Sequence, residues 1–175
     1  MTAWRIRPGL SGDRVLLEGF NCAKPGISWQ VEVEEFIRRD LCDWAFAPGA
    51  AGDDPRLLLT FESDSGDLVG LAAHERATLR GPDGDFYATR LQVVAVAAHW
   101  QGQRFPAGER ASDVVMSAAM VDISARVPPR YARVFALVHE ENAASIALCR
   151  RHGFIEEMSR AQDPSYRRLI TAHRD

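Results

Sequence analysis

The sequence predicts an α/β (α+β) chain in which helices flank one mixed β-sheet. Two apolar runs joined by a polar turn come first, as in an antiparallel hairpin. Strand and helix patterns then alternate twice, an order that places helices against a sheet with parallel neighbours. With 175 residues and 46% hydrophobic side chains, the chain suits one domain over residues 1–175 with a sizeable core.

The N-terminal half contains one predicted helix and the hairpin. Over residues 31–45, apolar side chains recur at helical spacing, with acidic residues early and arginines later, as the helix dipole favours. These apolar residues are Val33, Phe36, Ile37, Leu41 and Trp44. A loop over 47–55 leads to strands over 57–62 and 68–80, which an Asp-Ser-Gly-Asp turn connects. A second loop, 81–85, follows.

The next three elements are a strand, a helix and a strand. Residues 87–98 are rich in β-branched side chains and predict a strand buried on both faces. Residues 112–125 predict a buried helix with Ser112 as its N-cap, ending before Pro128. Residues 133–138 predict another buried strand.

The C-terminal part predicts a helix followed by two short strands. The helix spans 142–152, with Asn142 as its N-cap and Gly153 just beyond its end. Residues 154–158 and 166–172 then pair as terminal strands around a turn.

Composition and charge exclude several classes of protein. The net charge of −3 disfavours a nucleic-acid partner, because nucleic-acid-binding proteins neutralise phosphates with an excess of basic residues. No apolar stretch approaches the roughly 20 residues of a membrane span, so we expect a cytoplasmic protein without a membrane partner. The three cysteines, Cys22, Cys42 and Cys149, lack metal-site spacing, which predicts free thiols and no metal.

Two segments each join the end of a predicted strand to the start of a helix, where backbone N–H groups favour an anion. They cover residues 94–116 and 138–154. With these two segments in this order, the chain from about Leu57 onward resembles the GNAT superfamily of acetyl-CoA-dependent N-acetyltransferases. The first matches that family's Q/R-x-x-G-x-G/A loop, and the second its N-x-x-A-x-x-L-Y-x-x-x-G-F helix. The resemblance implies a centrally splayed sheet, acetyl-CoA as cosubstrate and no metal.

The resemblance also implies a set of cofactor-binding residues. They are Val94, Ala95, Val96, Gln101, Gly102, Gln103, Arg104, Ala107, Gly108, Ala111, Ser112, Asn142 and Ser145. The first motif departs from the family because Arg104 and Pro106 stand where it has glycines. Two alignments stay open: the ordinary loop, or a lengthened loop after which Ala111 and Ser112 begin the helix. We favour the second, in which Arg104 can donate two hydrogen bonds to a phosphate.

The second motif lacks the family's tyrosine, which Cys149 replaces. In many relatives that tyrosine donates a proton to the departing CoA thiolate, so the general acid cannot be carried over to this chain. A cysteine among apolar helical neighbours is more often a packed residue than an acid. Asn142 has two compatible roles, an N-cap and a contact to pantetheine or substrate.

The amine acceptor must lose a proton before it attacks, so a carboxylate or a histidine is needed as the base. Our candidates are Glu75 and His74, of which strand alternation puts only one on the productive face. Less favoured candidates are Glu62, His139, Glu140 and Glu141. Trp29, Phe36 and Trp44 either form a wall of the acceptor site or belong to the core.

The sequence therefore predicts acetyl transfer from acetyl-CoA to a primary amine, on a small molecule or a peptide, by direct attack and without a covalent enzyme intermediate. The sequence is also compatible with a homodimer. One alternative is a catalytically degenerate CoA-binding sensor or complex subunit. Another is an acetylating toxin that acts on charged tRNA, which the net charge of −3 disfavours.

Overall fold

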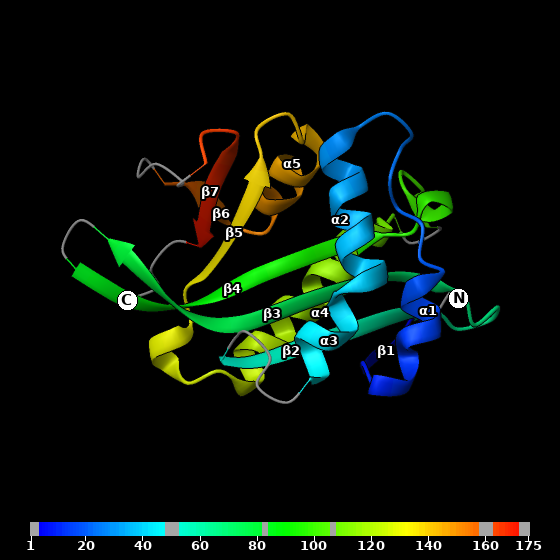
Figure 1. The fold of residues 1–175 in the computed structure, drawn as a ribbon, viewed down its shortest axis with the longest axis horizontal. Coiled ribbons are helices and arrows are strands. Elements are labelled where there is room, and N and C mark those ends of the chain that lie inside the picture. The colour runs from blue at the N-terminus through cyan, green and yellow to red at the C-terminus, as the bar shows by residue number, and fades with distance from the viewer. Residues whose placement is uncertain (1–3, 48–52, 82–83, 106–107, 158–162, 172–175) are drawn as a thin grey trace.

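The computed structural model describes residues 4–47, 53–81, 84–105, 108–157 and 163–171. Their strands form a sheet in the order β1-β2-β3-β4-β5-β7-β6 (Figure 1). The strands are β1 Trp4–Pro8, β2 Asp53–Glu62, β3 Leu68–Gly81, β4 Gly84–Val96, β5 Val134–His139, β6 Phe154–Glu156 and β7 Tyr166–Thr171. All neighbours pair antiparallel except β4 and β5, which are parallel. The sheet is therefore mixed, as the sequence predicted.

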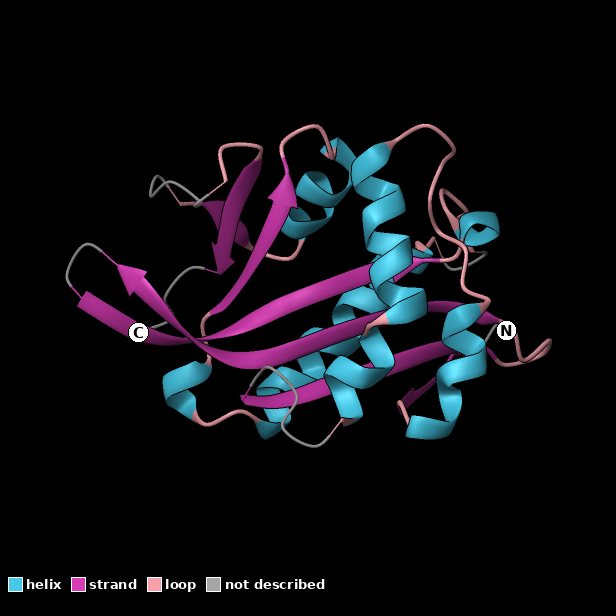
Figure 2. Cartoon of the chain, in the orientation of Figure 1, coloured by secondary structure: helices cyan, strands magenta, loops and turns pink. Residues whose placement is uncertain are grey.

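Helices cover both faces of the sheet (Figure 2). The helices are α1 Arg14–Glu18, α2 Ser28–Arg39, α3 Leu41–Phe46, α4 Ala111–Arg126 and α5 Ala143–Arg151. Helices α1–α3 lie on one face, which we call the α2 face, and α4 and α5 lie on the other, which we call the α4 face. None of the described helices is long and apolar enough to cross a membrane.

Each face of the sheet has its own core, and the register shifts in β3 and β4 change which residues of these strands face each side. The α2 face presents Leu59, Leu71, Ala73, Val93 and Ala95 to Leu17, Ile37 and Leu41. The α4 face presents Val69, Ala72, Leu91 and Val96 to Val115, Met116 and Ala119 of α4. The three cysteines are buried free thiols, as predicted.

The sheet splays at its centre, which confirms the expected architecture. Strands β4 and β5 pair only at Thr89–Val134 and Arg90–Phe135, and beyond these pairs they diverge. Just past this fork, β4 carries an extra residue, Gln92, between the pairs Ala73–Val93 and His74–Leu91. An extra residue of this kind is a β-bulge, which bends a strand and strengthens its local twist.

The helix predicted over 31–45 is wrong in its boundaries and continuity. It begins at Ser28 and breaks at Asp40, which ends α2 and precedes α3. The backbone hydrogen bonds Asp40 N–Phe36 O and Trp44 N–Asp40 O continue across the break, which explains why the periodicity looked unbroken. Val33, expected to face the core, is 38% exposed.

The N-terminal elements were not anticipated, and several predicted boundaries shift. Strand β1 and helix α1 precede the first predicted helix. Strand β2 begins at Asp53, inside the predicted loop, and β4 spans Gly84–Val96 rather than 87–98. Helix α4 begins at Ala111, so Arg110 and not Ser112 is its N-cap. Ser112 is the second residue of α4 and does not cap it.

Gly70 of β3 lies where two layers meet without room for a side chain. A Cβ there would approach Ala95 O to 2.5 Å and Val115 Cγ2 to 2.8 Å. We expect Gly70→Ala to lower the free energy of unfolding by about 1–3 kcal/mol, because overpacking forces backbone or side chains to shift. Urea denaturation measures the change. The control is Gly12→Ala, where nothing lies within 4 Å of the added Cβ, and an equal loss there would contradict the steric explanation.

Candidate active site

The C-terminal half of β4 has an edge without a strand partner. Ala97 N donates to Val69 O over 2.8 Å, so by antiparallel alternation the backbone groups of Ala95 also face β3. Those of Val94 and Val96 therefore point toward β5, which has diverged. Val96 O accepts a hydrogen bond from Gln101 Nε2 over 3.0 Å. The remaining polar groups of this edge need a partner other than a strand.

Two arginines flank the start of α4, beside this edge. Arg104 and Arg110 are opposite each other in an isolated antiparallel bridge, and Arg110 is the N-cap residue of α4. Like charges directly opposite across a bridge repel each other unless an anion lies between them. A 16-residue helix also presents the positive end of its dipole here. The arrangement therefore suits a phosphate group.

The acidic side chain in the first turn of α4 is occupied by other partners. Asp113 Oδ1 accepts from Arg151 Nη2 over 2.8 Å and contacts His152 Nε2 at 3.3 Å. Burial raises the pKa of this carboxyl, but Arg151 and His152 together outweigh burial and the net shift is downward. This ion pair holds the start of α4 against the end of α5.

The loop before α4 is longer than the family motif and folds back on the N-terminal strand. Phe105 packs on Trp4 of β1 and on Trp100, with ring centroids 4.4 Å and 5.5 Å apart. Gly102 and Gly108 have φ of +75° and +85°, values that favour glycine. Since α4 begins at Ala111, the lengthened alignment describes the loop correctly. Ala107 and Pro106 lie outside the described residues.

The glutamines of the first motif direct their amides into the protein. Gln101 Nε2 donates to Cys22 O and Val96 O, and Gln103 Nε2 donates to His99 O. The side-chain nitrogens of both expected cofactor-binding residues therefore already have protein acceptors.

Helix α5 begins on the opposite side of the splay. Asn142 Oδ1 accepts from Ser145 N over 3.0 Å, which confirms the predicted N-cap. Cys149 packs in the core of the α4 face, and burial raises the pKa of its thiol to about 11. Gly153, with φ of +82°, follows the helix as predicted.

The two candidate bases lie on opposite faces of β3. His74 faces α4, is 2% exposed and contacts Asp122 Oδ2 through Nε2 at 2.9 Å. Burial lowers the pKa of this imidazole, and Asp122 opposes that shift. The structure therefore gives His74 a structural partner on α4 and does not bring it to the α2 face.

Glu75 lies on the α2 face beside the fork of the sheet. Its register partner is Arg90, the last residue of β4 to pair with β5. Arg90 Nη1 lies 3.7 Å from Glu75 Oε1, while Glu75 Oε2 is buried without a hydrogen-bond partner. Glu75 is 7% exposed, and burial raises the pKa of its carboxyl against the opposing charge of Arg90. A carboxylate in this state is ready to accept a proton.

Beyond the fork, β5 ends at a group of aromatic rings. Leu137 of β5 is 42% exposed, although its strand neighbours are buried. Trp29 of α2 stacks on His139 with ring centroids 5.5 Å apart, and His139 meets Tyr166 edge to face at 5.4 Å. Of the three aromatic residues predicted to line an acceptor site, only Trp29 lies here. Phe36 and Trp44 pack against the core of the α2 face.

The other acidic candidates lie elsewhere. Glu62 closes the β2–β3 turn by accepting from Ser65 N. Glu140 and Glu141 are exposed at the turn after β5. Among the residues that the structure describes, no three His, Cys, Asp or Glu side chains converge as a metal site would require.

Comparison with known proteins identifies the fold. No protein-family model matches the chain, and no curated protein matches its sequence. Solved structures do match. PaiA N-acetyltransferase from Thermoplasma acidophilum, in complex with coenzyme A, has a TM-score of 0.63 and 12% identity, covering 98% of this chain and 99% of that one.

Two further structures agree. A protein described as a GNAT-family acetyltransferase from Desulfovibrio desulfuricans has a TM-score of 0.58 and 21% identity, covering 96% of each chain. A mutant of the toxin AtaT, bound to the C-terminus of the antitoxin AtaR and acetyl-CoA, has a TM-score of 0.64 and 14% identity, covering 97% of this chain and 94% of that one. This chain therefore has the GNAT fold.

The buried carboxyl of Glu75 makes a prediction about stability and pH. Because its pKa is raised in the folded chain, the free energy of unfolding falls as pH rises from the ordinary glutamate range through that raised value. In Glu75→Gln the side chain cannot ionise, so the free energy of unfolding of this variant does not fall for that reason. We expect the variant to gain stability relative to the parent as the pH rises above about 4, measured by urea unfolding.

Glu62→Gln is the matched control with the opposite sign. The hydrogen bond from Ser65 N lowers the pKa of the Glu62 carboxyl, so its ionised form stabilises the fold at neutral pH and this contribution disappears on acidification. This variant should be less stable than the parent at neutral pH, and the difference should shrink as the pH falls below about 4. If both variants respond alike, the environment assigned to Glu75 is wrong.

Proposed function

We propose that this protein is an acetyl-CoA-dependent N-acetyltransferase that acetylates a primary amine by direct attack. The observation that carries the proposal is the unpaired edge of β4 at Val94–Val96, which ends beside the Arg104–Arg110 pair and the start of α4. A long ligand with amide groups at one end and a diphosphate at the other matches this sequence of sites. The GNAT fold and the CoA-bound neighbours support it.

Each part of the site has a defined task in binding. The backbone groups of Val94 and Val96 that face the splay would hold the pantetheine amides as a strand partner would. Arg104, Arg110 and the first N–H groups of α4 would hold the diphosphate. Asn142, on the far side of the splay, would bound the channel at the start of α5.

Glu75 is the proposed general base. Its free Oε2 accepts a proton from the acceptor amine, directly or through water, and its raised pKa makes it a better base than an exposed glutamate. Arg90 stays close enough to favour the ionised state of Glu75. When the amine attacks the thioester, the new C–N bond forms, the C–S bond breaks and CoA leaves as a thiolate that takes a proton from solvent.

The diphosphate site makes the first functional prediction. Arg104→Ala should weaken acetyl-CoA binding by about 1.5–3 kcal/mol, because it removes hydrogen bonds to a charged group. The same variant should bind acetylpantetheine, which has no diphosphate, as well as the parent does. Isothermal titration calorimetry with both ligands measures the difference. Arg39→Ala on exposed α2 is the charge-matched control, and equal losses for the two ligands would refute the phosphate role of Arg104.

The second prediction compares the effects on turnover of substituting Glu75 and Cys149. Glu75→Gln should reduce kcat by roughly 100-fold or more with the Kd of acetyl-CoA unchanged, as expected when a general base is removed. Cys149→Ala should keep most of its turnover, because a buried thiol with a pKa of about 11 is packed away from solvent. Thiol release from acetyl-CoA measures both. The reverse pattern would make Cys149 the proton donor and Glu75 structural.

A screen of amine acceptors coupled to thiol release tests the function itself. Turnover with any amine supports the enzyme, while acetyl-CoA binding without turnover favours the alternative of a CoA-binding sensor or complex subunit. Failure of acetyl-CoA to bind refutes both. The panel includes an aminoacyl-tRNA, because one structural neighbour is AtaT complexed with acetyl-methionyl-tRNAfMet. The net charge of −3 makes this acceptor the second choice.

A further inference from the structure

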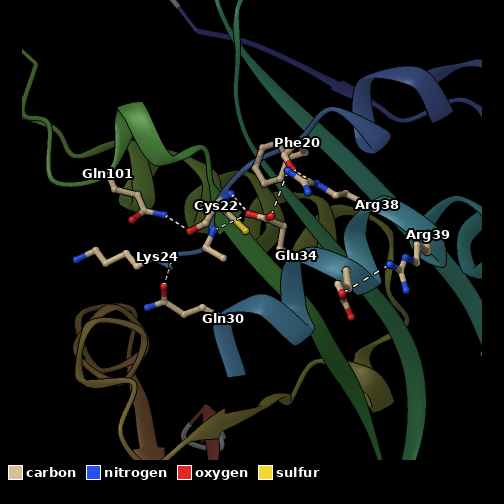
Figure 3. A network of polar contacts seen from close by, with 10 residues as sticks. Phe20, Cys22, Lys24, Gln30, Glu34, Arg38, Arg39 and Gln101 are labelled. Atoms are coloured by element: carbon tan, nitrogen blue, oxygen red, sulfur yellow. Dashed lines mark hydrogen bonds and ion pairs between the residues drawn. The ribbon is translucent and has the colours of Figure 1, made fainter. Parts of the chain in front are cut away.

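A short segment between α1 and α2 lies against the end of β4. This segment, residues 20–24, receives one backbone hydrogen bond from the turn after β4, from Ala98 N to Asn21 O over 2.7 Å. Gln101 adds a side-chain link (Figure 3). Its single amide nitrogen donates to Cys22 O over 2.7 Å and to Val96 O over 3.0 Å. One amide group therefore bridges the segment and the unpaired edge of β4.

Helix α2 holds the same segment from the other side. Glu34 Oε2 accepts from the backbone N–H groups of both Cys22 and Ala23, each over 2.7 Å. Arg38 Nε donates to Phe20 O over 2.7 Å, and Arg38 Nη2 contacts Glu34 Oε1 at 3.1 Å. Charge-assisted hydrogen bonds of this length are stronger than neutral ones. These bonds tie the segment to α2, and we call the two together the α2 cover.

The α2 cover reaches the ring group at the end of β5. Trp29, in the first turn of α2, stacks on His139. The cover thus spans both arms of the splay, held to β4 through residues 20–24 and to β5 through Trp29. The position of the α2 cover therefore sets how closely α2 lies over the proposed acceptor side of the fork, where Glu75 and Leu137 lie.

We propose that Gln101 is a positioning residue that couples the β4 edge to the α2 cover, so that occupation of the edge by acetyl-CoA also orders residues 20–24. This inference rests on the proposed function. The physical reason is that both N–H groups of one planar amide are used. A ligand that fixes the backbone at Val96 also fixes the amide of Gln101 and, through it, the carbonyl of Cys22. Gln101 has no contact with the reacting atoms in this role.

The variants are chosen so that the protein still folds. Gln101→Glu keeps the size of the side chain but has no N–H to donate to the two carbonyls, while the bonds of Ala98 and Glu34 to the segment remain. Gln103→Ala is the matched control. Gln103 lies in the same loop and its amide donates to His99 O, within that loop and not to residues 20–24.

Hydrogen–deuterium exchange read by mass spectrometry tests the coupling at saturating acetyl-CoA. In the parent and in Gln103→Ala, acetyl-CoA should slow exchange at Cys22 and Ala23 roughly threefold or more, because local opening becomes rarer. In Gln101→Glu this ligand-dependent slowing should disappear, with acetyl-CoA at a concentration that saturates the variant. A purely structural role would alter exchange in the free protein and leave the ligand-dependent difference intact.

The outcomes separate this inference from the proposed function. If acetyl-CoA binds the parent without slowing exchange at residues 20–24, or slows it equally in Gln101→Glu, the coupling is refuted and the transferase proposal stands. If acetyl-CoA fails to bind the parent, both are refuted. If Gln103→Ala loses the effect as fully as Gln101→Glu, the loop as a whole acts on the cover and the role of Gln101 is refuted.

Discussion

The divergence of β4 from β5 after the Arg90–Phe135 pair is the constraint on which the rest of the structure depends. A sheet that opens at its centre leaves backbone donors and acceptors without strand partners, and such groups are costly unless something else satisfies them. The bulge at Gln92, the lengthened loop and the starts of α4 and α5 are all arranged around this opening. The candidate site lies at an opening where strand-to-strand hydrogen bonding is incomplete.

Polar groups buried near this opening fall into two kinds. His74 is paired with Asp122 on the α4 face, so its burial is compensated within the fold. Glu75, the next residue, keeps one oxygen unpartnered on the α2 face, with Arg90 only 3.7 Å from the other. A chain tolerates an incompletely satisfied carboxyl more readily where a ligand completes it than where nothing does. Alternation along one strand thus separates a paired histidine from an incompletely satisfied carboxyl.

The N-terminal part of the chain completes the site, although the recognisable motifs lie after Leu57. Trp4 of β1 supports the loop before α4, and Trp29 of α2 reaches the end of β5. Residues 20–24 connect α2 to the end of β4 through Gln101 and Glu34. The part of this chain that carries no family motif therefore contacts both the loop before α4 and the end of β5.

Local features of the sequence determined most of the elements. Periodicity and turn residues fixed the β2–β3 hairpin, α4, β5, α5 and the terminal strands, and Asn142 marked its own helix start, because these signals act over a few neighbouring residues. Tertiary structure alone decided the break at Asp40, the place of β1, the face of Glu75 and the partners of Gln101. Each of these depends on a contact between residues far apart in the chain, such as Gln101 with Cys22. The spacing of residues along the chain does not show which distant carbonyl will accept a hydrogen bond from a given amide.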